Sequence, residues 1–370
     1  MKILIYVSSL TAGGAEKVAS LMANYWAEKY HVILLTDTPI EEDFFAIDSR
    51  VERQTTNFST AGFSFIKKIF LNLSSLLQLR RIIQTNQPDV VISHMDISNV
   101  RILLSSIGLK IPVVIEEHNN PAMVRKLPQP WRFFQSFAYH QLATIIVLLT
   151  KDLVKHYPST LQSKIRIIPN PLNIPTIISD SDEVTLSKPT FIAIGSLTRQ
   201  KGLDYLLEAF VLVSKVKPEW SLTILGEGEL RRDLTDYAEQ LGIADKVYMP
   251  GRVKHPYSVL KDADVYVMSS RFEGFPVALC EAMGVGLPCI SFDCPTGPAD
   301  IIVNNQNGIL VEYLNIECLA EKMIELANDP ELRKYFSSEA LKINDTLSLP
   351  SIMSQWETVI QTDCRVTTCS

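Results

Sequence analysis

The stretch FIAIG at Phe191–Gly195, followed by GLDYLLEAFVLVSKV at Gly202–Val216, decides the fold class. The first part is a short apolar run that ends in glycine, which is typical of a buried strand entering a tight turn. The second part repeats apolar side chains at helical spacing. A buried strand followed by an amphipathic helix is the repeating unit of a parallel α/β sheet.

The same alternation extends from this stretch in both directions. Upstream we expect strands over Ile3–Val7, His31–Thr36, Asp89–Ser93, Pro112–Glu116 and Thr144–Leu149, with a helix over Ala15–Glu28. Downstream we expect strands over Ser221–Leu225, Val247–Met249, Val265–Met268, Pro288–Phe292 and Gly308–Val311, and helices over Glu229–Leu241, Val259–Ala263, Pro276–Gly284, Ile316–Asn328 and Ser351–Gln361. Residues 169–190 interrupt the pattern with prolines and serines, which is typical of a linker.

The pattern therefore predicts two doubly wound, Rossmann-like α/β domains. The first spans residues 1–170, a linker spans 171–190, and the second domain spans 191–349. A C-terminal helical segment, 350–370, is expected to pack back on the first domain. Two such domains facing each other place a cleft between the carboxyl ends of two sheets, where ligands bind in folds of this kind.

Composition narrows the class of protein. The 370 residues include 35 basic and 41 acidic side chains, a net charge of −6, which argues against general nucleic-acid binding. The six cysteines form no pair of C-x-x-C motifs, so they predict reduced thiols in a cytoplasmic protein rather than a zinc site. The apolar N-terminus is too short for a signal peptide and predicts a first strand, and no apolar run reaches the ~18–20 residues of a membrane span.

Two loops carry candidate chemistry. Ser9–Glu16 joins a strand to a helix through Gly13 and Gly14, where backbone N–H groups can approach an anion. It matches neither a Walker loop nor a G-x-G-x-x-G fingerprint, so a plain tight turn remains an alternative. In the second loop, Glu273 precedes a predicted helix and Glu281 lies within it among apolar residues. A buried carboxylate costs free energy unless it is paired or binds something, but two surface glutamates are equally compatible with the spacing.

With this pair of glutamates the sequence resembles the retaining glycosyltransferases of family 4, whose E-x7-E motif matches FEGFPVALCEAM at 272–283. Further matches occur in the family's order: GGAEKV at 13–18, EEHNNP at 116–121, IPNPL at 168–172, GSLTRQKGLDYLLEAF at 195–210, LGEGELR at 225–231 and PGRV at 250–253. A closer resemblance, to enzymes that add N-acetylgalactosamine or similar sugars to undecaprenyl-pyrophosphate-linked oligosaccharides, rests on ISHMDISNV at 92–100, IGLKIPVVIEEHN at 107–119 and PQPWRFFQSFAY at 128–139. The resemblance implies the GT-B fold.

The resemblance also implies roles for individual residues. Glu273 would contact the donor sugar and Glu281 the nucleotide ribose, whose vicinal hydroxyls suit a carboxylate. Lys201 would neutralise the diphosphate leaving group. The rest of the implied donor site comprises the backbone around Pro276 (Gly274, Phe275 and Val277), Gly14 in the first loop, and Arg252.

One position departs from the family pattern. Ser196 stands where the family usually has a basic residue, so either Arg199 compensates or the diphosphate relies on Lys201 and helix N-termini. His118 matches a family histidine near the reacting face of the donor sugar, although a lone histidine at a strand end is more often structural. Asp96 and Asn170 are weaker matches, as acceptor contacts or as turn formers.

Two segments combine basic and aromatic residues without acids. Residues 62–81 include Lys67 and Lys68, and residues 122–140 include Arg125, Lys126, Trp131 and Arg132. Such segments suit an anionic membrane surface. The alternative is that their aromatic side chains are core and their cations a solvated face.

The sequence thus predicts a retaining hexosyltransferase that is peripheral on the inner face of the cell membrane. Its expected donor is UDP-GalNAc, UDP-Gal, UDP-Glc or UDP-GlcNAc, and its expected acceptor is an undecaprenyl-pyrophosphate-linked glycan in bacterial glycan or exopolysaccharide assembly. No cofactor or metal is expected, because the Asp180–Asp182 pair lies in the linker. The alternatives are a soluble or other lipid acceptor, an inactive sugar-binding protein of this fold, or an epimerase or phosphorylase, which the length and the Gly13–Glu16 start disfavour.

Overall fold

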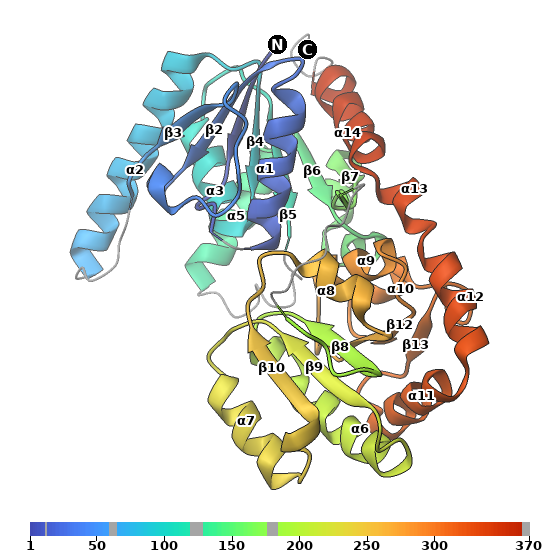
Figure 1. The fold of residues 1–370 in the computed structure, drawn as a ribbon. Helices are drawn as coiled ribbons and strands as arrows, with labels where there is room; N and C mark the ends of the chain where they lie inside the picture. The colour runs from blue at the N-terminus through green and yellow to red at the C-terminus, as the bar shows by residue number, and fades with distance from the viewer. Residues whose placement is uncertain (12, 59–64, 119–128, 176–183, 365–370) are drawn as a thin grey trace. The chain divides into compact units, whose positions relative to one another are not determined.

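The computed structural model describes residues 1–370 except 12, 59–64, 119–128, 176–183 and 365–370, and leaves the side chains of 65–72 and 129–134 undescribed. The chain divides into two compact units (Figure 1). The first comprises Met1–Pro171 together with Leu349–Ser370, and the second comprises Leu172–Ser348. In the described part of the chain, no helix is both long and apolar enough to cross a membrane.

The first unit is built on a seven-stranded parallel sheet with the order β3-β2-β1-β4-β5-β6-β7. Its strands are β1 (Lys2–Tyr6), β2 (His31–Thr36), β3 (Glu52–Thr55), β4 (Val90–His94), β5 (Val113–Glu117), β6 (Ile145–Leu148) and β7 (Ile165–Ile167). Its helices are α1 (Gly14–Trp26), α2 (Phe65–Asn86), α3 (Asp96–Ser105) and α5 (Gln129–Gln141), with short 3₁₀ turns η1 (Ile40–Glu42), η2 (Lys151–His156) and η3 (Ser159–Lys164). The central strands are covered on both faces, because Ile3, Leu4 and Ile5 are all fully buried in succession.

The C-terminal segment completes this first unit. Helix α14 (Leu349–Thr358) continues into a π-helical turn, η6 (Val359–Asp363), and packs against α1. Trp356 of α14 and Trp26 of α1 are both fully buried, with ring centroids 6.4 Å apart and an edge-to-face angle of 85°. Lys29 also pairs with Glu357 at 3.1 Å. The last helix of the chain therefore belongs to the core of the first unit.

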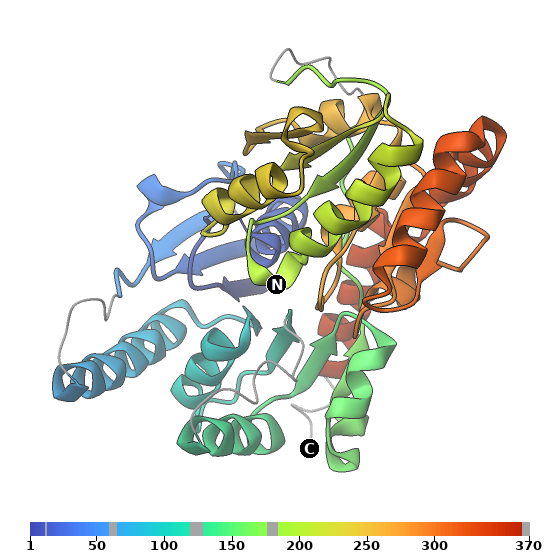
Figure 2. The same cartoon turned by 90° about the horizontal axis from the view of Figure 1, so that it is seen from below.

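The second unit is built on a six-stranded parallel sheet with the order β10-β9-β8-β11-β12-β13. Its strands are β8 (Thr190–Ile194), β9 (Ser221–Leu225), β10 (Val247–Gly251), β11 (Val265–Met268), β12 (Cys289–Phe292) and β13 (Ile309–Val311). Its helices are α6 (Leu203–Val216), α7 (Arg231–Gln240), α8 (Pro256–Asp262), α9 (Val277–Gly284), α10 (Pro298–Ile301), α11 (Ile316–Asn328), α12 (Pro330–Ala340) and α13 (Ile343–Leu347), with turns η4 (Arg199–Lys201) and η5 (Ala244–Lys246). Helices α6 and α11 lie side by side over one face of the sheet (Figure 2).

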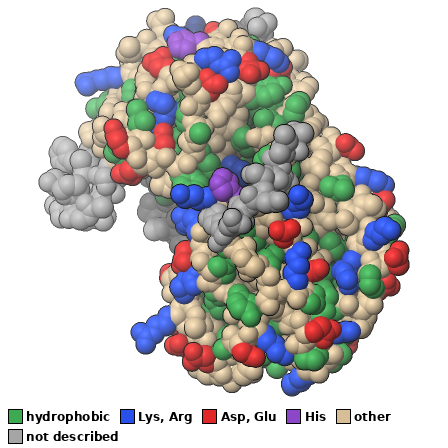
Figure 3. Space-filling model, viewed as in Figure 1, with side chains coloured by type: hydrophobic (Ala, Val, Ile, Leu, Met, Phe, Trp, Pro, Cys, Tyr) green, Lys and Arg blue, Asp and Glu red, His purple; other side chains and the backbone are tan. Residues whose placement is uncertain are grey.

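In both sheets, candidate site residues follow the carboxyl ends of strands. The apolar face of α6 (Leu206, Leu207 and Phe210) is fully buried against the sheet, as its helical spacing predicts. On the visible face of the second unit, acidic and basic side chains are interspersed (Figure 3). Four of the cysteines (Cys280, Cys289, Cys294 and Cys364) are buried free thiols, and burial raises the pKa of each.

The sequence analysis gave no bounds for the strands β3 and β7, nor for the helices α2, α3, α5, α10, α12 and α13. Strand β3 has the sequence ERQT, which carries no apolar alternation, and it forms an edge of the sheet by pairing only with β2 in the described structure. Strand β7 has three residues, too few for a periodic signal. Edge strands need one partner and little burial, so their sequences carry less of the pattern that identifies central strands.

Candidate functional site

In the second unit, two glycines position Lys201 at the carboxyl end of β8. A Cβ atom on Gly195 would come within 3.0 Å of Lys201 Cε, so the glycine gives room for the lysine stem. Gly202 adopts φ +59°, and a Cβ there would lie 2.1 Å from the backbone oxygen of Ser269. This left-handed residue starts α6 directly after Lys201 and lets it approach the end of β11.

Lys201 and Glu273 form the central pair of this unit. Lys201 Nζ donates to Glu273 Oε1 at 2.7 Å, and Ser270 Oγ donates to the same oxygen at 2.6 Å. The Thr296 hydroxyl donates to the backbone oxygen of Glu273. Glu273 is only 4% exposed, so its carboxylate depends on Lys201 and Ser270 for the solvation that water would otherwise give. Sequence reasoning missed Ser270 and Thr296, which no motif singled out.

Glu281 lies on α9, the helix that follows the Glu273 loop in the chain. The Tyr257 hydroxyl of α8 donates to Glu281 Oε1 at 3.0 Å, and Glu281 is 7% exposed. The alternative of two ordinary surface glutamates is therefore wrong, because Glu273 and Glu281 are both buried and hydrogen-bonded. Tyr257 was not predicted, because nothing in the sequence pairs it with a residue 24 positions later.

The loop between Glu273 and Glu281 starts helix α9. Pro276 is the N-cap rather than the first helical residue, and the N–H of Val277 donates to the Phe275 oxygen at 2.9 Å. Gly274 is partly exposed, whereas Phe275 and Pro276 are buried. The first turn of a helix has N–H groups with no partner inside the helix, so this end of α9 offers donors to an anion.

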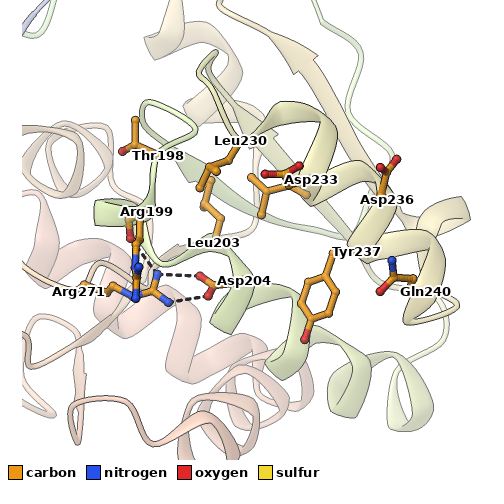
Figure 4. A pocket seen from close by; sticks show the side chains of 11 residues that line it. Thr198, Arg199, Leu203, Asp204, Leu230, Asp233, Asp236, Tyr237, Gln240 and Arg271 are labelled. Atoms are coloured by element: carbon orange, nitrogen blue, oxygen red, sulfur yellow. Dashed lines mark hydrogen bonds and ion pairs between the residues drawn. The ribbon is translucent and has the colours of Figure 1, made fainter.

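The candidate residues for binding the donor diphosphate do not all lie at one place in the second unit. Ser196 and Arg252 are exposed, after β8 and β10. Arg199 is also exposed and lines a cavity of about 520 Å³ between the start of α6 and α7 (Figure 4). Arg271 also lines that cavity and donates two hydrogen bonds to the Asp204 carboxylate, at 2.8 and 2.6 Å. Lys201 is not among the lining residues.

In the first unit, Gly14 is the first residue of α1 and Gly13 is its N-cap. The Glu16 carboxylate lies over Gly13, where an added Cβ would be 2.2 Å from Glu16 Oε2. Ser9 Oγ donates to Glu16 Oε1 at 3.4 Å. A carboxylate in the first turn complements the positive end of the helix dipole.

His118 belongs to a buried group with His94 and Glu116. Glu116 Oε2 lies 2.5 Å from His94 Nδ1 and 3.0 Å from His118 Nε2. Burial alone would raise the pKa of the Glu116 carboxyl, but the charges and hydrogen bonds of His118 and His94 lower it to about 2. Within the described residues, this is the one group of three His, Cys, Asp or Glu side chains whose ligand atoms converge, all within 4.8 Å, and one carboxylate oxygen pairs with one nitrogen of each imidazole. His94 lies in a stretch that the sequence analysis used, but no signal marked its role.

Asp96 lies at the start of α3, beside a second buried acid, Glu117. Asn99 Nδ2 donates to Glu117 Oε1 at 2.9 Å, and the Tyr139 hydroxyl donates to the same oxygen. Burial, reinforced by the Asp96 carboxyl, raises the pKa of Glu117 well above its usual range. Asn170 is 3% exposed and its Oδ1 is buried without a hydrogen-bond partner in the described structure.

The membrane candidates are described only in part. Lys67 and Lys68 lie in α2, and Trp131 and Arg132 lie in α5, but their side chains are not described. Arg125, Lys126 and the Asp180–Asp182 pair lie outside the described residues.

Comparison with known sequences gives the class of the protein. The profile of glycosyltransferase family 4 matches residues 12–174, and that of the group 1 glycosyl transferases matches 177–343. The chain belongs to glycosyltransferase family 4, as the motifs predicted, and its two parallel sheets confirm the predicted α/β class and GT-B fold. It is a glycosyltransferase of the hexosyltransferase class that transfers sugars from nucleotide sugars.

Two relatives illustrate this membership, and one solved structure illustrates the fold. The chain is 28% identical over 358 residues, covering 96% of this chain and 97% of the other, to a Campylobacter jejuni α-1,4-N-acetylgalactosaminyltransferase acting on a diNAcBac-PP-undecaprenol-linked glycan. It is 26% identical, over 97% of this chain and 99% of the other, to the amylovoran biosynthesis glycosyltransferase AmsD of Erwinia amylovora. The structure of Anabaena HepE in complex with UDP and glucose superposes with a TM-score of 0.78 at 16% identity, over 96% and 98% of the two chains.

Proposed function

We propose that this protein transfers a hexose or N-acetylhexosamine from a UDP-sugar to an undecaprenyl-pyrophosphate-linked oligosaccharide, with retention of anomeric configuration, in bacterial glycan or exopolysaccharide assembly. The observation that carries the proposal is the pair between half-buried Lys201 and buried Glu273 at 2.7 Å, with buried Glu281 on the helix that follows Glu273. These are the three side chains that the family motif assigns to the diphosphate, the donor sugar and the ribose.

Each residue would contribute a different interaction. Lys201 would neutralise the charge that develops on the departing diphosphate, assisted by the N-terminal amides of α9. Glu273 would accept hydrogen bonds from donor-sugar hydroxyls, and Glu281 from the ribose hydroxyls. His118 of the first unit would contact the donor sugar. Exposed Ser196 offers no positive charge, so the diphosphate would depend on Lys201 more than in relatives with a basic residue there.

The choice of acceptor is supported by a relative and by composition. The Campylobacter jejuni relative acts on an undecaprenol-linked glycan and aligns with 96% of this chain. The acid-free basic segments 62–81 and 122–140 lie in the first unit, which would meet the acceptor. A polyprenyl chain does not leave the bilayer readily, since exposing each CH₂ costs about 0.8 kcal/mol. The enzyme would therefore act at the membrane surface.

The test is turnover with a defined donor panel. Purified full-length protein is incubated with UDP-GalNAc, UDP-Gal, UDP-Glc or UDP-GlcNAc and with polyprenyl-pyrophosphate glycans extracted from bacterial membranes. We expect release of UDP with one of these donors only when the lipid acceptor is present, and the same rate in EDTA. Transfer to a soluble glycan at equal efficiency would contradict the lipid acceptor. Loss of activity in EDTA with recovery in Mn²⁺ would contradict metal-free chemistry.

A further inference from the structure

Two neighbouring strands bring His94, Glu116 and His118 together. His94 is the last residue of β4 and lies directly opposite Glu116 in the register of β5, and His118 follows the end of β5. The side chains of His94 and Glu116 are 0% and 1% exposed, and that of His118 is 8% exposed. Of the three side chains, His118 is therefore the one that a ligand outside the core can contact.

The Glu116 carboxylate determines which ring nitrogens of His94 and His118 carry a proton. The pKa of Glu116 is lowered to about 2, so at neutral pH this side chain is ionised and can only accept hydrogen bonds. Its Oε2 lies 2.5 Å from His94 Nδ1 and 3.0 Å from His118 Nε2, so each of these nitrogens carries a proton. The 3.2 Å separation between the two nitrogens then follows from their sharing one acceptor.

The group is asymmetric. His94 Nε2 is buried without a hydrogen-bond partner in the described structure. His94 therefore supports Glu116 through its Nδ1–H. His118 has its Nε2 committed to Glu116, so Nδ1 is the ring nitrogen left for a ligand.

The other titratable groups near the carboxyl ends of β4 and β5 form a separate cluster. Successive side chains of a strand point to opposite faces, so Glu117 lies on the other face from Glu116. There it meets Asn99 and Asp96 of α3 and Tyr139 of α5, and burial, reinforced by the Glu117 and Asp96 carboxyls, raises the pKa of Tyr157 well above its usual range. The charge that faces His118 directly is therefore that of Glu116.

We propose that His94 and Glu116 are positioning residues that hold His118 in the Nε2–H form, so that its Nδ1 accepts a hydrogen bond from a hydroxyl of the donor sugar. This inference rests on the proposed function, in which His118 contacts that sugar. It adds a reason why the histidine presents one defined nitrogen rather than a mixture of two tautomers.

The tautomer can be measured without substrate. In ¹⁵N-histidine-labelled full-length protein, long-range ¹H–¹⁵N correlations at a pH where the ring is neutral are expected to show a protonated Nε2 and an unprotonated Nδ1 for His118. Glu116→Gln and His94→Leu are expected to give mixed tautomers. His94→Asn, whose amide N–H can replace Nδ1–H, is expected to restore the Nε2–H form. His31→Gln is the matched control, because His31 pairs with Glu52 at 2.9 Å on the surface of the same unit.

Binding gives the functional readout. In Glu116→Gln, affinity for a UDP-sugar is expected to fall on the order of tenfold, the range of one hydrogen bond, while affinity for UDP is unchanged. An unchanged His118 tautomer in Glu116→Gln and His94→Leu, both still folded by their spectra, would overturn the inference. So would stoichiometric zinc retained by the dialysed protein, because a metal would displace the shared protons. An Nε2–H tautomer in a protein that transfers no sugar would instead contradict the proposed function.

Discussion

Lys201 Nζ donates to Glu273 Oε1 at 2.7 Å, so the cation assigned to the donor diphosphate is held by the carboxylate assigned to the donor sugar. The pair links the turn after β8 to the loop after β11, and Ser270 completes it by donating to the same carboxylate oxygen. A bound diphosphate would compete with Glu273 for the ammonium. Donor binding would thereby free the carboxylate for the sugar hydroxyls.

The first prediction concerns this lysine. Lys201→Met should weaken UDP binding by about 10- to 100-fold, because one charge-assisted hydrogen bond contributes ~1.5–3 kcal/mol. Isothermal calorimetry with UDP measures the change. Lys215→Met, at an exposed position of the adjoining helix α6, is the control and should bind as wild type. Equal affinity in both variants would remove Lys201 from the donor site.

The second prediction concerns the ribose. Glu281→Ala should cost on the order of 2–4 kcal/mol of UDP affinity, since two charge-assisted bonds are lost and water replaces them in part. Tyr257→Phe should cost less, because it removes one hydrogen bond that orients Glu281, at 3.0 Å to Oε1, and leaves the carboxylate in place. Calorimetry with UDP and with uracil separates loss of ribose contacts from loss of fold. Unchanged UDP affinity in Glu281→Ala would rule out the ribose role.

The third prediction concerns the membrane. Neutralising Lys67, Lys68, Arg125, Lys126 and Arg132 together should reduce binding to anionic vesicles, at roughly 1 kcal/mol per cation near the surface. Added salt should weaken wild-type binding in the same way, because it screens these charges. UDP binding should persist.

A matched variant controls for net charge. Neutralising five exposed cations of the second unit, Lys188, Lys215, Arg232, Lys261 and Lys334, should leave vesicle binding as in wild type. If the first-unit variant still sediments with vesicles as wild type does, the basic segments are a solvated face, and the acceptor is soluble or is brought by a protein partner.

The sequence predicted most of the central strands, the first helix and most helices of the second unit, because their apolar periodicity is set by burial against the sheets. Strand β9 and helix α11 have the bounds expected from the pattern, Ser221–Leu225 and Ile316–Asn328. The motif also selected Glu273 and Lys201, which the structure brings together although they are 72 residues apart. Ser270, Tyr257 and His94 could not be predicted, because their roles come from contacts between elements rather than from local spacing.

The fourth prediction concerns the C-terminal helix. Trp356→Ala should lower the free energy of unfolding of the first unit by about 3–5 kcal/mol, because a fully buried ring that contacts Trp26 is replaced by a cavity. Denaturant unfolding followed by tryptophan fluorescence and circular dichroism measures the loss. Gln355→Ala, an exposed neighbour on the same helix, should change stability by less than about 0.5 kcal/mol. A similar effect of both substitutions would show that α14 does not contribute to this core.

The anomeric configuration of the product shows whether this enzyme transfers the sugar with retention. The lipid-linked product of wild-type enzyme, formed from an α-linked UDP-sugar, is released from its lipid and analysed by NMR, with Glu273→Gln as the comparison. We expect a new α-linkage with wild type, and from Glu273→Gln little product despite normal UDP binding. A β-linked product, or full activity of Glu273→Gln, would contradict a retaining transfer that depends on the Lys201–Glu273 pair.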